Sequence, residues 1–493
     1  MNRFLGVFAA GVTVNTAILS AQTEQPNVLM VIVDDWGYHD LSLTGSKLYE
    51  THNIDRLADE STTFSQAYVA YPRSVPSRYS IMTGRHCARM QTGAKSDDRK
   101  VDTDSYCIAE PFKAGGYETF FIGKWHLSDG KTLPQHKGFD INIGGGKAGG
   151  TGTHFAPFNK PSDTNPDKLI YGMDDANPGE YLTDYMSRKT VDYIRQKHDK
   201  PFFAVCSFYA VHTPIEGKKE LIGKYRKKVK SLNLSEDILK KEEAGVTKTQ
   251  QDHPVYAAMI ESVDNAVGDM IAALKETGQY DNTVFILISD HGGLSNRGMK
   301  PRELATTNSP LKAGKGHLYE GRIRVPLLIH TPGQHDKQIK DQMVMSYDLL
   351  PTLADICNLK VSKEAELDGI SIKPLLDGKK QEQLDSRDLF WHKASERPNS
   401  TGDYVSTAIR SGNYKLIDFY LQNRVELYDL SKDPGEKNNI AAQNPEKVTE
   451  LMAKIETWRK NTGVKMGEKG NAEHKKKKKA GKIGNKDTVQ NFV

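Results

Sequence analysis

The chain has 493 residues, of which 37% are hydrophobic, enough to build a large core and more than one domain. Its formal net charge of +5 is unevenly placed, because residues 465–493 contain nine Lys and three acidic residues, a local charge of +6. The rest of the chain is nearly neutral, which gives no support for nucleic-acid binding. The segment 465–493 lacks an apolar period and is predicted to be a disordered lysine-rich tail. A patch that holds an anionic polysaccharide or a membrane surface is the alternative.

The N-terminus has the pattern of a secretory signal. Arg3 precedes an apolar run over residues 4–19, and Ser20-Ala21-Gln22 offers a cleavage site after Ala21. The run is short for a membrane span, and no later segment is long and apolar enough to be one. We therefore expect an exported protein, periplasmic or secreted, with a signal peptide over residues 1–21 and no transmembrane segment.

Strand-like apolar runs alternate with helical patterns along most of the chain. The runs at 28–33, 119–122, 202–208 and 284–288 suit buried parallel strands, and residues 256–274 have helical apolar spacing. This alternation predicts a large α/β domain over residues 26–385, with a mostly parallel sheet covered on both faces.

The pattern changes near residue 385. Short strands at hairpin distances are expected at 389–392, 404–409, 414–420 and 425–430, followed by a helix at 445–462. Residues 386–464 should therefore form a smaller antiparallel sheet plus helix that packs on the main domain.

The four cysteines are Cys87, Cys107, Cys206 and Cys357. Their spacing is not that of a metal site or a small disulfide scaffold. Cys206 lies in an apolar run and is expected to be a buried thiol, and one disulfide is possible in an oxidising compartment.

Carboxylates follow two of the predicted strands. Asp34 and Asp35 end the first run, and Asp290 and His291 come after the run at 284–288. Ligand sites of open α/β sheets lie at the carboxyl ends of the strands. Converging carboxylates there suit a hard cation, Ca²⁺ or Mg²⁺.

The segment Pro72-Arg73-Ser74-Val75-Pro76-Ser77-Arg78 resembles the signature of the type I sulfatases, in which a Cys or Ser before x-Pro-Ser-Arg is oxidised to formylglycine. The resemblance extends from about residue 27 to 463 and includes 49–58 and 425–436. It is closest to bacterial arylsulfatase A-like carbohydrate sulfatases of the serine type. It implies an alkaline-phosphatase-like fold, a formylglycine (3-oxoalanine) made from Ser74, and an anaerobic radical enzyme as the maturing partner. Hydrated to a diol, this group would attack sulfur with one hydroxyl and expel sulfate with the other.

The resemblance also assigns the site residues. One calcium ion per chain would be held by Asp34, Asp35, Asp290, His291 and the modified Ser74. Arg78 would place positive charge near the diol, and Lys124 and Lys315 would bind the sulfate. Lys315 or His212 would protonate the leaving group, and His126 would take a proton from the diol.

Two further features lie near Lys315 in the sequence. We expect no catalytic role for Lys312 or His317. Relatives usually read Glu-Gly-Gly where this chain has Glu320-Gly321-Arg322. Arg322 is therefore expected either to contact the substrate or to be simply exposed.

The predicted function is an exported sulfatase that hydrolyses sulfate esters of a glycan, with the loop 144–154 and the Trp391-His392 segment as candidate linings of the sugar subsite. One alternative is a phosphomonoesterase or phosphonate hydrolase of the same superfamily, since a fold likeness alone does not separate them. The other alternative is a glycan-binding protein in which Ser74 stays unmodified.

Overall fold

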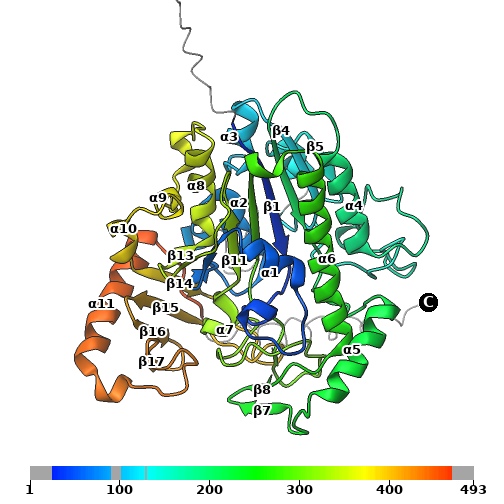
Figure 1. Ribbon diagram of the computed structural model, residues 1–493. Coiled ribbons are helices and arrows are strands. Elements are labelled where there is room, and N and C mark those ends of the chain that lie inside the picture. Colours follow the sequence, from blue (N-terminus) through cyan, green and yellow to red (C-terminus); the bar gives the residue numbers. More distant parts are fainter. Residues whose placement is uncertain (1–24, 90–100, 128–129, 469–493) are drawn as a thin grey trace, which may run out of the picture.

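The computed structural model describes residues 25–89, 101–127 and 130–468, which centre on an eight-stranded sheet (Figure 1). Its strand order is β12-β2-β11-β9-β1-β6-β4-β5. The strand bounds are β1 (Asn27–Val33), β2 (Thr62–Phe64), β4 (Glu118–Gly123), β5 (Ile141–Ile143), β6 (Phe202–Ser207), β9 (Thr283–Ser289), β11 (Leu327–His330) and β12 (Gln338–Lys340). Only β11 runs antiparallel to its neighbours in this sheet. The predicted mixed, mostly parallel sheet is confirmed.

Helices cover both faces of the sheet, which explains why β1 is apolar throughout. All seven residues of β1 are buried. Val28, Met30 and Ile32 belong to the core beneath α2 (Ser74–Thr83), α3 (Ala109–Ala114) and α8 (Leu349–Ile356). The alternate residues pack toward α1 (His52–Ala58), α4 (Leu182–Ile194) and α6 (Pro254–Glu276), on the opposite side of β1 in Figure 1. A continuous apolar run is the pattern expected for such a doubly covered strand.

The C-terminal part forms the predicted antiparallel sheet plus helix. Its strands, in spatial order, are β14 (Leu389–Lys393), β15 (Ser406–Ser411), β16 (Tyr414–Phe419) and β17 (Arg424–Asp429). Ile409, Leu416 and Leu427 pack one face against α11 (Pro445–Thr462). Residues of the opposite face, Trp391 and Ile417 among them, join the core of the main domain. The smaller sheet is therefore fixed to the larger one through a shared hydrophobic core.

Several elements lie outside the sequence predictions. A small sheet pairs β7 (Leu239–Glu242), β8 (Gly245–Lys248) and β10 (Asn296–Arg297), next to α5 (Lys219–Ser231) in Figure 1. A second pairs β3 (Ala67–Tyr68) with β13 (Val344–Met345). Three one-turn helices were also not predicted: α7 (Glu320–Ile323), α9 (Lys373–Leu376) and α10 (Glu382–Asp385).

The structure describes only part of the two ends of the chain. The predicted signal peptide, 1–21, and the tail from 469 onward lie outside the described residues. The first residues of the predicted tail contact the C-terminal sheet, because the backbone N–H of Gly467 donates to the hydroxyl of Tyr420 at 2.9 Å. Within the described residues, no helix has the length and apolarity to cross a membrane.

All four cysteines are buried free thiols, so the possible disulfide is not formed. Burial raises the pKa of the Cys206 thiol to about 12, which keeps it protonated.

Candidate active site

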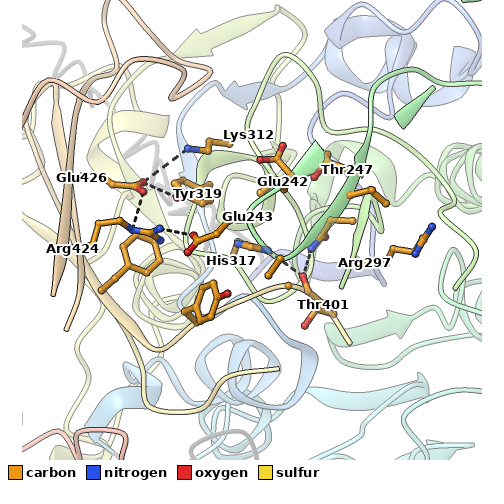
Figure 2. A pocket seen from close by; sticks show the side chains of 17 residues that line it. Glu242, Glu243, Thr247, Arg297, Lys312, His317, Tyr319, Thr401, Arg424 and Glu426 are labelled. Carbon is orange, nitrogen blue, oxygen red and sulfur yellow. Dashed lines mark hydrogen bonds and ion pairs between the residues drawn. The ribbon is translucent and has the colours of Figure 1, made fainter. Parts of the chain in front are cut away.

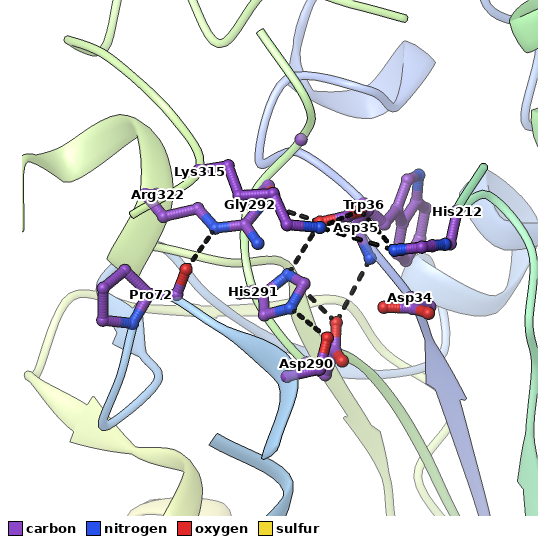
Figure 3. A network of polar contacts seen from close by, with 12 residues as sticks. Asp34, Asp35, Trp36, Pro72, His212, Asp290, His291, Gly292, Lys315 and Arg322 are labelled. Atoms are coloured by element: carbon purple, nitrogen blue, oxygen red, sulfur yellow. Dashed lines mark hydrogen bonds and ion pairs between the residues drawn. The ribbon is translucent and has the colours of Figure 1, made fainter. Parts of the chain in front are cut away.

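The carboxyl ends of β1 and β9 bring the predicted metal-binding residues together. The two strands are parallel, with Val33 opposite Ser289, so the residues that follow them emerge side by side. One ligand atom each of Asp34, Asp290 and His291 lie within 4.8 Å of one another, and all three side chains are buried (Figure 3). The convergence expected from the sequence is present in the fold.

Ser74 is the first residue of α2 and points at the same group. Its Oγ lies 2.8 Å from Nε2 of His291. One helical turn later, Arg78 donates from Nε to Oδ2 of Asp290 at 2.8 Å and from Nη1 to the Lys124 carbonyl at 2.8 Å. Four residues apart on one helix, Ser74 and Arg78 share a face, so the signature segment delivers both to the carboxylates. The helix N-terminus also favours negative charge at Ser74.

The chemistry of this cluster fits a hard cation. Oδ1 of Asp34 is buried and accepts no hydrogen bond from any described residue. Burial alone would raise the pKa of Asp34, but the charges of Lys124 and Arg78 hold it well below its usual value, so it is a carboxylate. Burial and the charge of Arg322 lower the pKa of His291 to about 3, which leaves a neutral ring able to act as a ligand. An ionised carboxylate oxygen without a donor, beside a neutral imidazole, is a donor set that fits calcium.

The neighbouring carboxylates share this electrostatic setting. Burial and the charge of Asp34 raise the pKa of Asp290 to about 7. A bound cation would remove the cost of holding both carboxylates ionised in a buried place.

Asp35 joins the cluster but is already held by two cations. Its Oδ1 lies 3.2 Å from Nδ1 of His291, so it faces the proposed metal group. Lys315 Nζ donates to its Oδ2 at 2.9 Å, and Arg322 Nη1 donates to its Oδ1 at 2.8 Å. Burial opposes ionisation of Asp35, but these two charges hold its pKa well below the usual range.

One of the two expectations for Arg322 is wrong: the residue is not exposed, because its side chain is fully buried. Its contact with a substrate stays a prediction. Its guanidinium also donates to the carbonyls of Pro72, at 2.9 Å, and Gly292. The one-turn helix α7 packs inward, so position 322 meets an internal carboxylate rather than solvent.

The cationic residues predicted to handle the sulfate surround the same carboxylates. Lys124 follows β4, is fully buried and contacts Asp34 through Nζ. Nζ of Lys315 lies 3.4 Å from Nε2 of His212, which in turn is 3.6 Å from Asp35 (Figure 3). Burial and the charge of Lys315 lower the pKa of His212 to about 4, so the imidazole is neutral near pH 7. Burial also lowers the pKa of Lys315.

Comparison with known proteins identifies this arrangement. A family model described as "Sulfatase" matches residues 26–359, and one described as "N-sulphoglucosamine sulphohydrolase, C-terminal" matches residues 313–461. The chain belongs to the sulfatase family. A "Sulfatase" of Formosa agariphila is 30% identical to it, covering 93% of this chain and 94% of its own. Human arylsulfatase A is 27% identical, covering 85% and 84%.

Solved structures agree with this assignment. Ps i-CgsB, solved in complex with k-i-k-neocarrahexaose, is 29% identical with a TM-score of 0.70, covering 88% of this chain and 93% of its own. The phosphonate monoester hydrolase of Agrobacterium radiobacter is 19% identical with a TM-score of 0.61, covering 89% and 96%, and shares the fold. The fold is thus the alkaline-phosphatase-like one, and the protein is a sulfuric ester hydrolase.

The remaining predicted residue of this sulfatase, His126, lies beneath the same loop as His212. His126 is half-buried with a left-handed backbone (φ +57°), and desolvation and the charge of Lys124 lower its pKa well below the usual value. Gly149 packs on its ring so closely that a Cβ there would clash with it, and a Cβ at Gly150 would lie 3.5 Å from His212. The loop 144–154 therefore covers both imidazoles, as a sugar-subsite lining would.

The second predicted sugar contact is wrong. Trp391 is fully buried and donates from Nε1 to the Val69 carbonyl at 2.8 Å. The ring nitrogens of His392, also buried, lie 2.8 Å from Thr407 Oγ1 and 2.9 Å from the Lys465 carbonyl. The strand β14 turns both side chains into the protein, which a period-two pattern alone does not reveal.

Lys312 and His317 line a separate pocket that borders the Lys315 segment (Figure 2). The pocket encloses about 170 Å³ between the β7–β8 hairpin, residues 312–319 and the C-terminal sheet. Nε2 of His317 lies 3.1 Å from the Thr401 carbonyl, and the Lys312 ammonium stacks on the Tyr319 ring. That neither residue is catalytic stays a prediction.

Arg302 was missed by sequence reasoning. It is half-buried, and within the described residues its guanidinium has neither a hydrogen-bond nor an ion-pair partner. Burial lowers its pKa, whereas the charge of Asp35 raises it, so it lies within electrostatic reach of the site. It stands in a loop without a motif, and an isolated Arg in such a loop gives no signal in the sequence.

Proposed function

We propose that this protein is an exported sulfatase that removes sulfate from a poly- or oligosaccharide by means of a formylglycine made from Ser74. The observation that carries the proposal is the 2.8 Å approach of Ser74 Oγ to His291, inside a buried group of carboxylates and cations. An ordinary serine needs a base to become a nucleophile. A formylglycine at this position would supply two hydroxyls on one carbon, one to attack sulfur and one to expel sulfate.

Calcium is the metal that the donor set favours. Asp34, Asp290, His291 and Ser74 would hold it, with Asp35 beside them. The ion would supply positive charge to the sulfate oxygens and to the attacking hydroxyl. Arg78 keeps Asp290 oriented toward the group through its 2.8 Å hydrogen bond.

The remaining residues divide the binding and proton-transfer roles. Lys124 and Lys315 place fixed positive charge where sulfate oxygens would sit. Of the pair at the leaving-group side, Lys315 is the one that carries a proton near pH 7, because the pKa of His212 is about 4. We assign leaving-group protonation to Lys315, and its lowered pKa makes it a better acid. The neutral, half-buried His126 can accept a proton from the Ser74-derived group.

The glycan assignment draws on the relatives. Ps i-CgsB, at 29% identity, was solved with a carrahexaose. In this chain the glycine-rich loop 144–154 lies over His126 and His212, where the sugar of a bound sulfate ester would extend. We also propose that the protein is exported and that an anaerobic radical enzyme converts Ser74 to formylglycine.

The deciding experiment combines the intact mass of the Ser74 peptide with a sulfate-release assay. The protein is made together with an anaerobic maturase, and the Ser74→Ala variant is the matched control. We expect loss of two hydrogens at Ser74, sulfate release from sulfated oligosaccharides, and no release by the variant or after calcium removal. Faster turnover of an aryl phosphate than of the aryl sulfate would favour the phosphatase alternative. An unmodified Ser74 in protein from the native organism would refute the formylglycine claim.

A further inference from the structure

The residue that precedes Ser74 is tied to the C-terminal part of the chain. Arg73 has an extended backbone and occupies the N-cap of α2. Its Nη2 lies 2.9 Å from both carboxylate oxygens of Asp403, which is fully buried. Arg73 also approaches Thr401 Oγ1 at 3.4 Å. A charge-assisted contact between a buried arginine and a buried carboxylate is short and strong, so it restrains the position of Arg73.

Asp403 is itself held rigidly by the C-terminal subdomain. Lys393 of β14 contacts its Oδ2 through Nζ, and Thr401 contacts its Oδ1 through Oγ1. The loop before it is compact, since the backbone N–H groups of residues 400–402 all donate to the Arg397 carbonyl. The Asp403 carboxylate is therefore fixed by its own subdomain, and its position determines that of the Arg73 guanidinium.

The same loop touches the segment that carries Lys315. Gly316 has a left-handed backbone (φ +93°) and lies so close to Asp403 that a Cβ would clash with the carboxylate. The Thr401 carbonyl lies 3.1 Å from His317 Nε2 and accepts from Asn296, whose amide also reaches the Lys315 carbonyl at 3.2 Å. The Gly316 N–H donates to the Pro72 carbonyl at 3.3 Å. Residues 72–74, 315–317 and 401–403 thus meet at one buried point.

We propose that Asp403 is a positioning residue that sets Ser74 relative to Lys315, acting through Arg73 on one side and the Gly316 backbone on the other. This rests on the proposed function, in which Ser74 provides the nucleophile and Lys315 the acid. In-line displacement needs both groups on opposite sides of the sulfur, and a misplacement of about 1 Å costs about 10²-fold in rate. The C-terminal subdomain is then part of the active-site scaffold, although none of its residues touches the reacting atoms.

The test compares Asp403→Asn, Arg73→Met and their double variant in matured protein, with an aryl sulfate as substrate. The matched control is Asp418→Asn, because Asp418 is also buried and binds an arginine, Arg459 at 2.6 Å, but does so between β16 and α11. We expect each single variant to lose about 10- to 100-fold in kcat with less than about threefold change in KM. The double variant should be no slower than the slower single one, since both act through one contact. Asp418→Asn should keep kcat while losing thermal stability.

Further measurements keep the outcome decisive. Crystal structures of Asp403→Asn and Asp418→Asn should show residues 72–74 displaced from 315–317 in the first only. If Asp403→Asn does not fold, Arg73→Lys takes its place and should give an intermediate kcat, because it keeps the charge but loses the planar guanidinium that also reaches Thr401 and Ser395. Multiplicative losses in the double variant, an equal loss in Asp418→Asn, or an undisplaced Ser74 segment would overturn the proposal. A wild-type protein without turnover would refute the proposed function instead, and the crystal structures would still decide the role of Asp403.

Discussion

Arg322 offers the sharpest test of how this sulfatase balances charge around its cluster of buried carboxylates. The side chain is fully buried and donates to Asp35 at 2.8 Å, to Pro72 at 2.9 Å and to Gly292. Removing one partner of a buried ion pair costs about 3–5 kcal/mol, because the other charge is left uncompensated. Arg322→Met should therefore lose about that much free energy of unfolding when calcium is absent.

Calcium should restore part of this loss. The ion would bring positive charge to the same carboxylates that Arg322 neutralises, so the variant gains more from binding it than the wild type does. We expect calcium to bind the variant at least about tenfold more tightly, which makes the stability deficit smaller by about 1.4 kcal/mol at saturation.

The assay is urea unfolding in EDTA and in saturating calcium, together with calorimetric titration of calcium into the folded protein. Arg459→Met is the control, since Arg459 is also buried against a carboxylate, that of Asp418, in the C-terminal subdomain. Its deficit should be the same in both conditions. An Arg322→Met deficit that does not change with calcium, or weaker calcium binding by this variant, would refute the reasoning.

Three further predictions concern the site and its scaffold. Lys124→Met should lower kcat/KM on an aryl sulfate by about 10²- to 10³-fold, as loss of one preorganised donor does, and an unchanged value would remove Lys124 from sulfate binding. Arg302→Ala should raise KM for a multiply sulfated oligosaccharide and leave KM for an aryl sulfate unchanged, because the Arg302 guanidinium is unpaired within the described residues. Equal effects on both substrates would exclude a contact between Arg302 and the glycan. For Asp403, burial alone would raise the pKa, but Lys393 and Arg73 hold it well below its usual value. The carboxylate then stabilises the fold above its unfolded pKa of about 3.9 and this contribution is lost as pH falls below that value, so urea unfolding between about pH 5 and pH 3 should show a shallower decline for Asp403→Asn than for the wild type.

The pattern of apolar runs along the chain was enough to predict the large sheet. It also predicted which residues lie at the carboxyl ends of its strands. Apolar runs buried on both faces mark β1, β4, β6 and β9, because a strand covered by helices on both sides has no polar face. The residues that follow them are local in sequence, so the Ser74 signature and the carboxylates after β1 and β9 could be found by reading. The hairpins predicted between residues 404 and 430 are local in sequence as well, and Gly412 and Asn423 in their turns adopt a left-handed backbone that few other residue types tolerate.

Only the tertiary structure determined the contacts between segments that are distant in the sequence. Asp403 lies 330 positions from Arg73, and no spacing rule connects the two. Arg322 and Asp35 are 287 positions apart, and the inward packing of a one-turn helix, not the motif, buries their ion pair. The direction in which β14 faces likewise depends on the core it packs against, which is why Trp391 and His392 were placed wrongly. Sequence thus specified the chemistry that each strand end carries, and packing specified which charges meet and which stay free for a substrate.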